Sequence, residues 1–319
     1  MMLAARLDAH QGPEGIRVGE LPEPGAHADE ALVDVRAAGL SFPDLLMSRG
    51  EYQFQPPLPH AIGADVVGLC RTDVPTLGIA AGDRVASVIT HGAAAAVATV
   101  PAVRLLAVPD ALSDVQAATM PLAYLTAHLT LVTRARAQPG EWVLINGSTG
   151  SVGSALIQVA KALGCRVIAL ARRPEQRDQI AAADIVIDEW SKDAIRTATG
   201  GHGADIVTDV VGTDEVVLEA LRSLAPGGRL MTLGFVGGTI PQIRANRLLL
   251  GNTDVRGVSW GPYSRAQPGF MQTQWADIVR WHADGRINPP TPQVRPLAEA
   301  ADALRAIAAG GAPRQVVTI

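Results

Sequence analysis

A glycine-rich segment in the middle of the chain has the composition of a loop that holds a phosphate group. Residues 146–153 read NGSTGSVG. They follow a continuous apolar run at 142–145, typical of a buried parallel strand, and precede apolar residues at helical spacing up to position 163. Glycines let the backbone approach a pyrophosphate, and the N-terminus of the next helix attracts its charge. This context predicts a dinucleotide site, and a tight structural turn in another α/β fold is the alternative.

The glycine pattern departs from the usual form at its first position. Ser148 stands where the usual motif has its first glycine, while Gly150 and Gly153 occupy the other two glycine positions. The pattern alone would be weak evidence for a cofactor. Its place between a buried strand and an amphipathic helix, with a further strand after it, is what favours the dinucleotide site.

Two arginines after the next apolar run indicate which dinucleotide is bound. Residues 166–170 predict a strand, and an NAD site would have an acidic residue near its end to hold the ribose 2′-hydroxyl. The chain has Arg172 and Arg173 there instead. Guanidinium forks suit a 2′-phosphate, so the predicted cofactor is NADPH. Glu175 lies close by, and the alternative is a solvated charged loop.

Strands alternating with helical stretches predict an α/β fold around this site. Further strand-like runs occur at 185–187, 205–211 and 229–233. Such alternation is typical of a doubly wound parallel sheet. We place this dinucleotide-binding domain at residues 111–259.

The first part of the chain predicts a second, β-rich domain. Short strand-like runs at 31–39, 62–70 and 83–89 are separated by glycine and proline turns. The tail from residue 260 contains several prolines and one predicted helix at 297–308. We expect it to fold back, so that residues 1–110 and 260–319 form one discontinuous domain.

Composition narrows the range of partners and locations. The 319 residues carry a formal net charge of −4, which argues against nucleic acid and anionic membranes as partners. Two cysteines cannot make a disulfide framework, and no apolar run reaches 18 residues. We therefore expect a cytoplasmic protein. The seven histidines have no ligand-like spacing, so no metal site is expected.

Taken together, these segments resemble the zinc-independent quinone oxidoreductase (zeta-crystallin-like) family of the medium-chain dehydrogenase/reductase superfamily. The resemblance covers essentially the whole chain and depends on the order and spacing of its motifs. These are AGLSFPD at 38–44, RGEY at 49–52, LPHAIGAD at 58–65, GDRV at 82–85, PLAYLTA at 121–127, DVVG at 209–212, LAPGGR at 224–229 and LGFVGG at 233–238.

The resemblance implies a Rossmann domain and a GroES-like catalytic domain, with the active site in the cleft between them. It also implies a homodimer in which one sheet continues across two subunits, and residues 253–258 are the candidate edge strand. The residues expected to contact NADPH are Thr126, Thr149, Gly150, Ser151, Val152, Gly153, Arg172, Arg173, Gly212, Phe235 and Val236.

The same resemblance places Ser41, Asp44 and Tyr52 around the substrate as candidate catalytic residues. Tyr52 is the candidate proton donor or carbonyl partner, because a related enoyl-thioester reductase branch has a tyrosine at the matching position. The alternatives are that Tyr52 only packs and that Asp44 holds a loop amide or an arginine. Zinc-dependent relatives have Cys and His-Glu where this chain has Ser41 and Ala64-Asp65, and the apolar residues beside Asp65 predict a buried structural role.

Without a metal, such a site polarises a carbonyl through hydrogen bonds and dipoles alone, which suits an acceptor already poised for hydride. The first hypothesis is NADPH-dependent reduction of a quinone or a related electron-poor carbonyl. The second is reduction of an enone or a 2-enoyl thioester of the enoyl-CoA type. The third is a cofactor-binding protein with little catalysis, such as a sensor or a crystallin-like protein.

Overall fold

The computed structural model describes residues 1–25, 27–171, 173, 177–310 and 312–319. The chain forms two units. Unit 1 contains residues 1–122, 268–279 and 289–319, and unit 2 contains residues 123–267 and 280–288. Unit 1 is discontinuous, but its bounds differ from the expected 1–110 and 260–319: its first part extends to residue 122, and residues 260–267 and 280–288 of the tail belong to unit 2.

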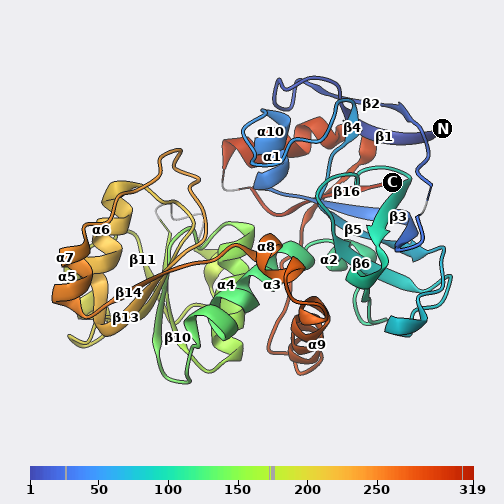
Figure 1. Cartoon of the computed structure of the whole chain (residues 1–319). Helices are drawn as coiled ribbons and strands as arrows, with labels where there is room; N and C mark the ends of the chain where they lie inside the picture. Colours follow the sequence, from blue (N-terminus) through green and yellow to red (C-terminus); the bar gives the residue numbers. More distant parts are fainter. Residues whose placement is uncertain (26, 172, 174–176, 311) are drawn as a thin grey trace. The chain divides into compact units, whose positions relative to one another are not determined.

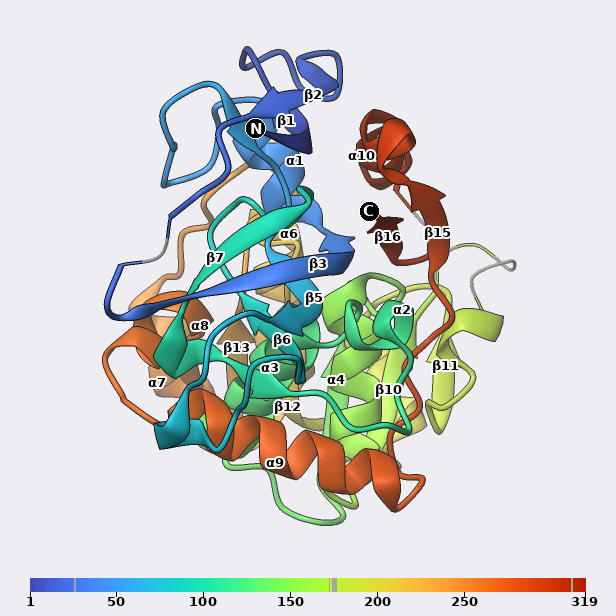
Figure 2. The same cartoon turned by 90° about the vertical axis from the view of Figure 1, so that its right-hand side faces the viewer.

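Unit 1 is built from two sheets that are mainly antiparallel. The smaller sheet has the order β2 (Ile16–Leu21), β1 (Met2–Leu7), β4 (His60–Ala61). The larger sheet has the order β15 (Gln293–Pro296), β16 (Gln315–Thr318), β3 (Glu30–Leu40), β5 (Asp65–Cys70), β6 (Arg84–Val88), β8 (Leu106–Ala107), with β7 (Val97–Pro101) also pairing with β3. Figure 2 shows β3 as a long strand that both β5 and β7 join, and α10 (Ala300–Ala309) beside β15 and β16.

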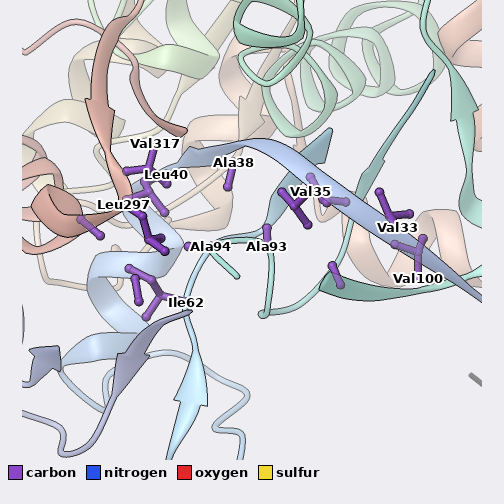
Figure 3. Packing of buried hydrophobic residues seen from close by; sticks show 14 of the residues in the cluster. Val33, Val35, Ala38, Leu40, Ile62, Ala93, Ala94, Val100, Leu297 and Val317 are labelled. Atoms are coloured by element: carbon purple, nitrogen blue, oxygen red, sulfur yellow. The ribbon is translucent and has the colours of Figure 1, made fainter. Parts of the chain in front are cut away.

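The core of unit 1 follows from the alternation of apolar residues along β3. Val33 and Val35 point to the same side of the strand and are buried together with Val100 of β7. At the other end of the strand, Leu40 lies near Ile62 (Figure 3). The short helices of this unit are α1 (Phe42–Ser48) and α2 (Asp114–Ala117), with 3₁₀ turns η1 (Pro75–Leu77), η2 (Ala102–Arg104) and η6 (Leu297–Glu299).

Unit 2 has one parallel sheet of six strands. The strand order is β11 (Ile185–Ile187), β10 (Arg166–Leu170), β9 (Trp142–Ile145), β12 (Ala204–Asp209), β13 (Leu224–Thr232), β14 (Asp254–Gly257). The chain starts in the middle at β9, builds outward to β11 and then returns to β12. This is the doubly wound order of the Rossmann fold, with its topological switch between β9 and β12. The α/β fold class predicted from the sequence is confirmed.

Helices cover both faces of this sheet (Figure 1). One face carries α5 (Lys192–Ala198), α6 (Asp214–Ser223) and α7 (Ala245–Gly251), and the other carries α4 (Ser151–Ala162). The remaining helical segments are α3 (Pro121–His128), the π-helix η3 (Leu129–Ala135), the 3₁₀ turn η5 (Asp178–Ile180), α8 (Trp260–Arg265) and α9 (Phe270–Ala283). Both α3 and α9 contribute residues to both units.

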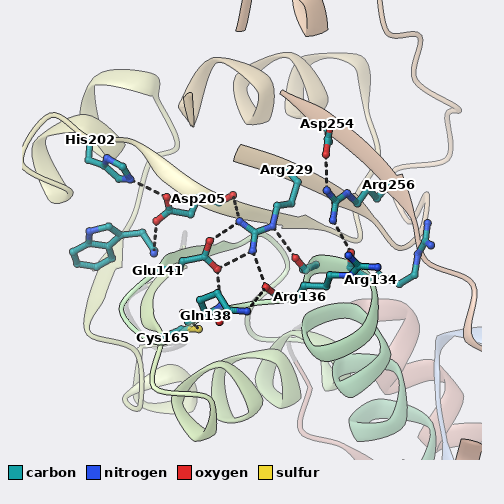
Figure 4. A network of polar contacts seen from close by, with 12 residues as sticks. Arg134, Arg136, Gln138, Glu141, Cys165, His202, Asp205, Arg229, Asp254 and Arg256 are labelled. Atoms are coloured by element: carbon teal, nitrogen blue, oxygen red, sulfur yellow. Dashed lines mark hydrogen bonds and ion pairs between the residues drawn. The ribbon is translucent and has the colours of Figure 1, made fainter. Parts of the chain in front are cut away.

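The amino ends of β9, β12 and β13 are joined by one ion pair and by hydrogen bonds (Figure 4). The Arg229 guanidinium donates to both carboxylate oxygens of Glu141 at 2.7 Å, and its Nε donates to the Ala135 carbonyl at 2.9 Å. Asp205, in β12, accepts a hydrogen bond from the Trp142 backbone N–H at 2.8 Å. This amino edge is the opposite end of the strands from the glycine-rich loop.

Within the described ranges, no helix combines the length and the apolar character needed to cross a membrane.

Candidate cofactor and substrate site

The glycine-rich loop directly follows β9 and leads into α4, as the sequence predicted. Gly147 has a φ of 73°, in the left-handed region that favours glycine. A Cβ at Gly153 would lie 2.1 Å from the Gly147 carbonyl oxygen, so no larger residue fits there. The hydroxyl of Ser148, at the position of the usual first glycine, donates to the Leu170 carbonyl at the end of β10. These contacts fold the loop tightly over the start of α4.

The start of α4 has no side chain that caps it. Gly150 is the N-cap residue and is exposed, and Thr149, Ser151 and Val152 are partly buried. The first N–H groups of a helix lack intrahelical partners and carry the positive end of the helix dipole. A tight glycine turn leading into an uncapped helix is the geometry that accepts a pyrophosphate. The loop therefore fits the dinucleotide that the sequence predicted.

Two further loops lie at the same edge of the sheet, one after β12 with Gly212 and one after β13 with Phe235 and Val236. Gly212 has a φ of 71°, and a Cβ on it would lie 2.6 Å from a ring carbon of Phe235. The Val236 N–H donates to the Val210 carbonyl at 3.2 Å. The structure thus brings together Gly212, Phe235 and Val236, and the side chains of Phe235 and Val236 are 44% and 49% exposed. In doubly wound sheets, ligands bind at these carboxyl ends of the strands.

Thr126 is partly buried on α3, shortly before the helix changes to the π-helix η3. The Thr130 hydroxyl donates to the Thr126 carbonyl at 2.7 Å, so this carbonyl has a partner where the helical pattern changes. The buried Tyr124 hydroxyl donates to Gln158 of α4 at 3.1 Å. This bond ties α3 to the helix that the glycine-rich loop begins.

Of the two arginines expected at the 2′-phosphate, the structure describes Arg173. Arg172 lies outside the residues that the structure describes. Arg173 is exposed and follows β10, whose carboxyl end neighbours that of β9.

In unit 1, Ser41 and Asp44 form a buried cap at the start of α1. The Ser41 backbone N–H and hydroxyl both donate to Asp44 at 2.8 Å, and the Gly63 N–H donates to its other carboxylate oxygen at 3.1 Å. Burial raises the pKa of Asp44, and these hydrogen bonds oppose the shift. The arrangement matches the alternative in which Asp44 holds a loop amide.

Tyr52 lies in the loop between α1 and β4 and is partly buried. Its carbonyl accepts a hydrogen bond from the Gln55 side chain at 2.9 Å, which folds the loop into a turn.

Two histidines that the sequence analysis did not select lie together beside this loop. The rings of His60 and His91 are 5.1 Å apart, and Phe54 meets His91 edge-on at 6.5 Å. Burial lowers the pKa of His91 to about 4 and also lowers that of His60, so both rings are neutral near pH 7. Their contact could not be predicted from the sequence, because the two histidines lie in separate segments of the chain.

Asp65 begins β5 and is buried, as the sequence analysis expected. It accepts the Leu122 backbone N–H at 2.8 Å in the first turn of α3, and its other oxygen accepts from Arg314. Burial raises the pKa of Asp65 to about 6 although the Arg314 guanidinium acts in the opposite direction. Arg314 was not identified from the sequence, because it lies near the other end of the chain.

The remaining candidates for chemistry give no support for thiol or metal catalysis among the described residues. Cys70 and Cys165 are free and buried, and burial raises the pKa of the Cys165 thiol to about 11. No group of three or more His, Cys, Asp or Glu residues in the described ranges is placed to hold a metal ion.

An apolar pocket of about 370 Å³ in unit 1, between α9 and the segments around η1 and β8, has little polar character. Gln272 and Trp275 in its wall donate hydrogen bonds to the carbonyls of Val103 and Ala107. These two N–H donors are therefore already used within the protein.

Comparison with known proteins identifies the family. Residues 27–110 match the model of the alcohol dehydrogenase GroES-like domain, and residues 151–277 match that of the zinc-binding dehydrogenase. Quinone oxidoreductase-like protein 2 of Rattus norvegicus is 34% identical over 283 residues, covering 86% of this chain and 80% of the relative. The chain belongs to the quinone oxidoreductase-like family of the medium-chain dehydrogenase/reductase superfamily. It is therefore an oxidoreductase of this superfamily, and the resemblance found in the sequence is confirmed.

Solved structures of family members cover the whole chain. The quinone oxidoreductase of Thermus thermophilus, also solved as a complex with NADPH, is 34% identical with a TM-score of 0.86, and the match covers all of both chains. A mycobacterial protein solved as a complex with NADPH is 29% identical with a TM-score of 0.91, also over all of both chains.

Proposed function

We propose that this protein uses NADPH to reduce a quinone or a related electron-poor carbonyl compound without a metal. The observation that carries the proposal is the glycine-rich loop over the uncapped start of α4, next to Gly212 at the same sheet edge. When bound, the nicotinamide supplies the hydride. The residues of this chain would bind and orient the cofactor: the glycine-rich loop would take the pyrophosphate, Thr126 would hold the nicotinamide, and Arg172 and Arg173 would hold the 2′-phosphate.

On the substrate side, we propose Tyr52 as the proton donor or carbonyl partner. Ser41 and Asp44 belong to the same site and fix the backbone from which the following loop starts. The names of the relatives support a quinone as acceptor. Reduction of an enone or 2-enoyl thioester remains the second candidate, and cofactor binding with little catalysis the third.

The deciding experiment is turnover of NADPH with a panel of quinones, enones and 2-enoyl thioesters. Quinone reduction above all other acceptors supports the proposal, and enone or thioester reduction supports the second candidate. Tight NADPH binding without turnover of any acceptor would support the non-catalytic alternative. A cytoplasmic location also stays a prediction.

Changing both Arg172 and Arg173 to Ala is expected to raise the Michaelis constant for NADPH at least about tenfold, because each loses a charge-assisted hydrogen bond worth about 1.5–3 kcal/mol. The constant for NADH should hardly change, since NADH has no 2′-phosphate. The NADPH effect should shrink in high salt. Arg196→Ala on α5, also exposed, is the matched control. Equal weakening of both cofactors would show that the substitutions disturb the loop itself, and no change in either constant would remove the main support for NADPH.

We also propose a homodimer formed through β14. This strand ends the sheet order and pairs with β13, and Leu249 and Leu250 of the preceding helix are 76% and 79% exposed. An open sheet edge beside exposed leucines calls for covering or pairing. Sedimentation is expected to show a dimer that Leu249→Glu with Leu250→Glu converts to monomer, while Val103→Glu in unit 1 leaves it intact. A wild-type monomer at all concentrations would contradict the proposal.

A further inference from the structure

A buried carboxylate lies at the topological switch of the sheet in unit 2. Asp209 ends β12 and Asn146 follows β9, the two strands between which the chain changes direction. Both side chains are almost completely buried, at 0% and 2% exposed. The Asn146 amide donates to Asp209 at 2.9 Å, so one hydrogen bond joins the ends of two strands.

Asp209 also fixes the loop that follows its own strand. The same oxygen that accepts from Asn146 accepts the Val211 N–H at 2.9 Å, and the other oxygen accepts the Gly212 N–H at 3.1 Å. All three donors are neutral, and burial raises the pKa of Asp209. The loop is held next to Phe235. The ring of Phe235 lies so close to Gly212 that a Cβ there would be 2.6 Å from a ring carbon.

Asn146 connects this carboxylate to the glycine-rich loop. Its side-chain oxygen accepts the Gly147 N–H at 3.1 Å, while the Gly147 carbonyl accepts the Gly150 N–H at 3.1 Å. Val210 packs over Gly147, where a Cβ would come within 2.3 Å of a Val210 methyl group. The two loops are thus tied together by one hydrogen-bonded chain and one close apolar contact.

We propose that Asp209 and Asn146 are positioning residues that hold the glycine-rich loop and the Gly212 loop in the arrangement that binds the dinucleotide. The N–H groups of Val211 and Gly212 already give each Asp209 oxygen one hydrogen bond. The additional bond from Asn146 is the one that connects Asp209 to the end of the neighbouring strand β9. The inference rests on the proposed cofactor site. It predicts that the pair affects NADPH and NADH alike, because neither residue is placed to distinguish the 2′-phosphate.

The experiment compares Asp209→Asn with Asp205→Asn. Both substitutions lie in β12 and change a carboxylate to an amide, but Asp205 lies at the amino edge, where it accepts from Trp142. In Asp209→Asn the new NH₂ group must face an N–H donor in either orientation of the amide. Dissociation constants of NADPH and NADH are measured by calorimetry on the whole protein, together with thermal unfolding.

Asp209→Asn is expected to raise both dissociation constants at least about tenfold and by the same factor, which corresponds to about 1.4 kcal/mol. Asp205→Asn should change them by less than about twofold, even where it lowers the unfolding temperature, because a loss of stability alone leaves the loops of the folded protein in place. Asn146→Ala keeps the two bonds inside the Gly212 loop and should weaken both cofactors as well, with faster amide exchange at residues 147–150 in the cofactor-free protein.

The outcomes separate this inference from the proposed function. A wild-type protein that binds neither cofactor contradicts the proposed function. Wild-type binding with unchanged constants in Asp209→Asn and Asn146→Ala overturns the positioning role, and so does a loss confined to NADPH or an equal loss in Asp205→Asn. If Asp209→Asn does not fold, Asn146→Ala decides the question.

Discussion

Replacing Arg314 by Met is expected to lower the free energy of unfolding by about 3–5 kcal/mol, because it leaves the buried Asp65 carboxylate without its charged partner. Asp65 is 0% exposed and the Arg314 side chain 4%, so water cannot replace the lost contact. Denaturant unfolding at pH 8 measures the effect. Arg305→Met is a suitable control, because Arg305 pairs with Glu14 and Asp302 on the surface and should contribute little.

The loss of unfolding free energy in Arg314→Met should depend on pH. The pKa of Asp65 in the folded protein is raised to about 6 from 3.8, so the folded state retains a proton that the unfolded chain releases between these values. This carboxyl therefore stabilises the fold fully below about pH 4 and loses that contribution as the pH rises through about 6. Without Arg314 the pKa of Asp65 rises further. The deficit of Arg314→Met should then be larger at pH 8 than at pH 5.

A second substitution tests the explanation. Asp65→Asn in the Arg314→Met background removes the uncompensated charge but keeps an oxygen that can accept from the Leu122 N–H. The double variant should recover a large part of the stability that the single variant loses. Wild-type stability of Arg314→Met at pH 8 would show that the pair has no such role.

Replacing Tyr52 by Phe is expected to lower turnover of enones by about 10²-fold or more, and that of quinones much less. Reduction of an enone adds hydride to one carbon and requires a proton at the neighbouring carbon. A reduced quinone instead takes its protons on oxygen, where water can deliver them. A side-chain donor therefore matters more for enones. The ratio of the two turnover numbers, wild type against variant, is the measurement.

Tyr124→Phe is the matched control. It removes another tyrosine hydroxyl, one that is buried and bonded to Gln158, so its effect should be on stability and equal for both classes of acceptor. Small and equal effects of Tyr52→Phe would identify Tyr52 as a packing residue.

The parallel sheet and its glycine-rich loop could be predicted because their signals are local. Continuous apolar runs are typical of strands buried on both faces, and the strands at Trp142–Ile145 and Arg166–Leu170 agree with the structure. The strand at Ile185–Ile187 also agrees, but it is the edge strand and is only partly buried. The strand predicted at 205–211 ends at Asp209, because the carboxylate of that residue takes the next N–H groups into a turn. The strand predicted at 229–233 begins earlier, at Leu224, through a bulge that accommodates the Pro-Gly-Gly turn.

The polar partners could not be predicted, because they depend on tertiary contacts. Asp65 and Arg314 are 249 positions apart, and Asn146 and Asp209 are 63 apart. Each residue alone is compatible with many environments. The sequence nonetheless held one signal for each pair. Asp65 and Asp209 each lie among apolar residues at one end of a strand. Such a carboxylate must find hydrogen-bond donors once it is buried, although the sequence does not say which.

The bidentate pair of Arg229 and Glu141 lies far from the residues expected to set cofactor preference, although stability and activity are often in conflict within enzymes. This pair joins the strands at the edge away from the glycine-rich loop, and the Arg229 side chain is 10% exposed. Substitutions that make the protein more heat-resistant could therefore be sought around it, while cofactor preference is re-engineered at the other end of the same strands. A laboratory evolution experiment can therefore select substitutions for thermal stability at one end of the strands and substitutions for cofactor selectivity at the other.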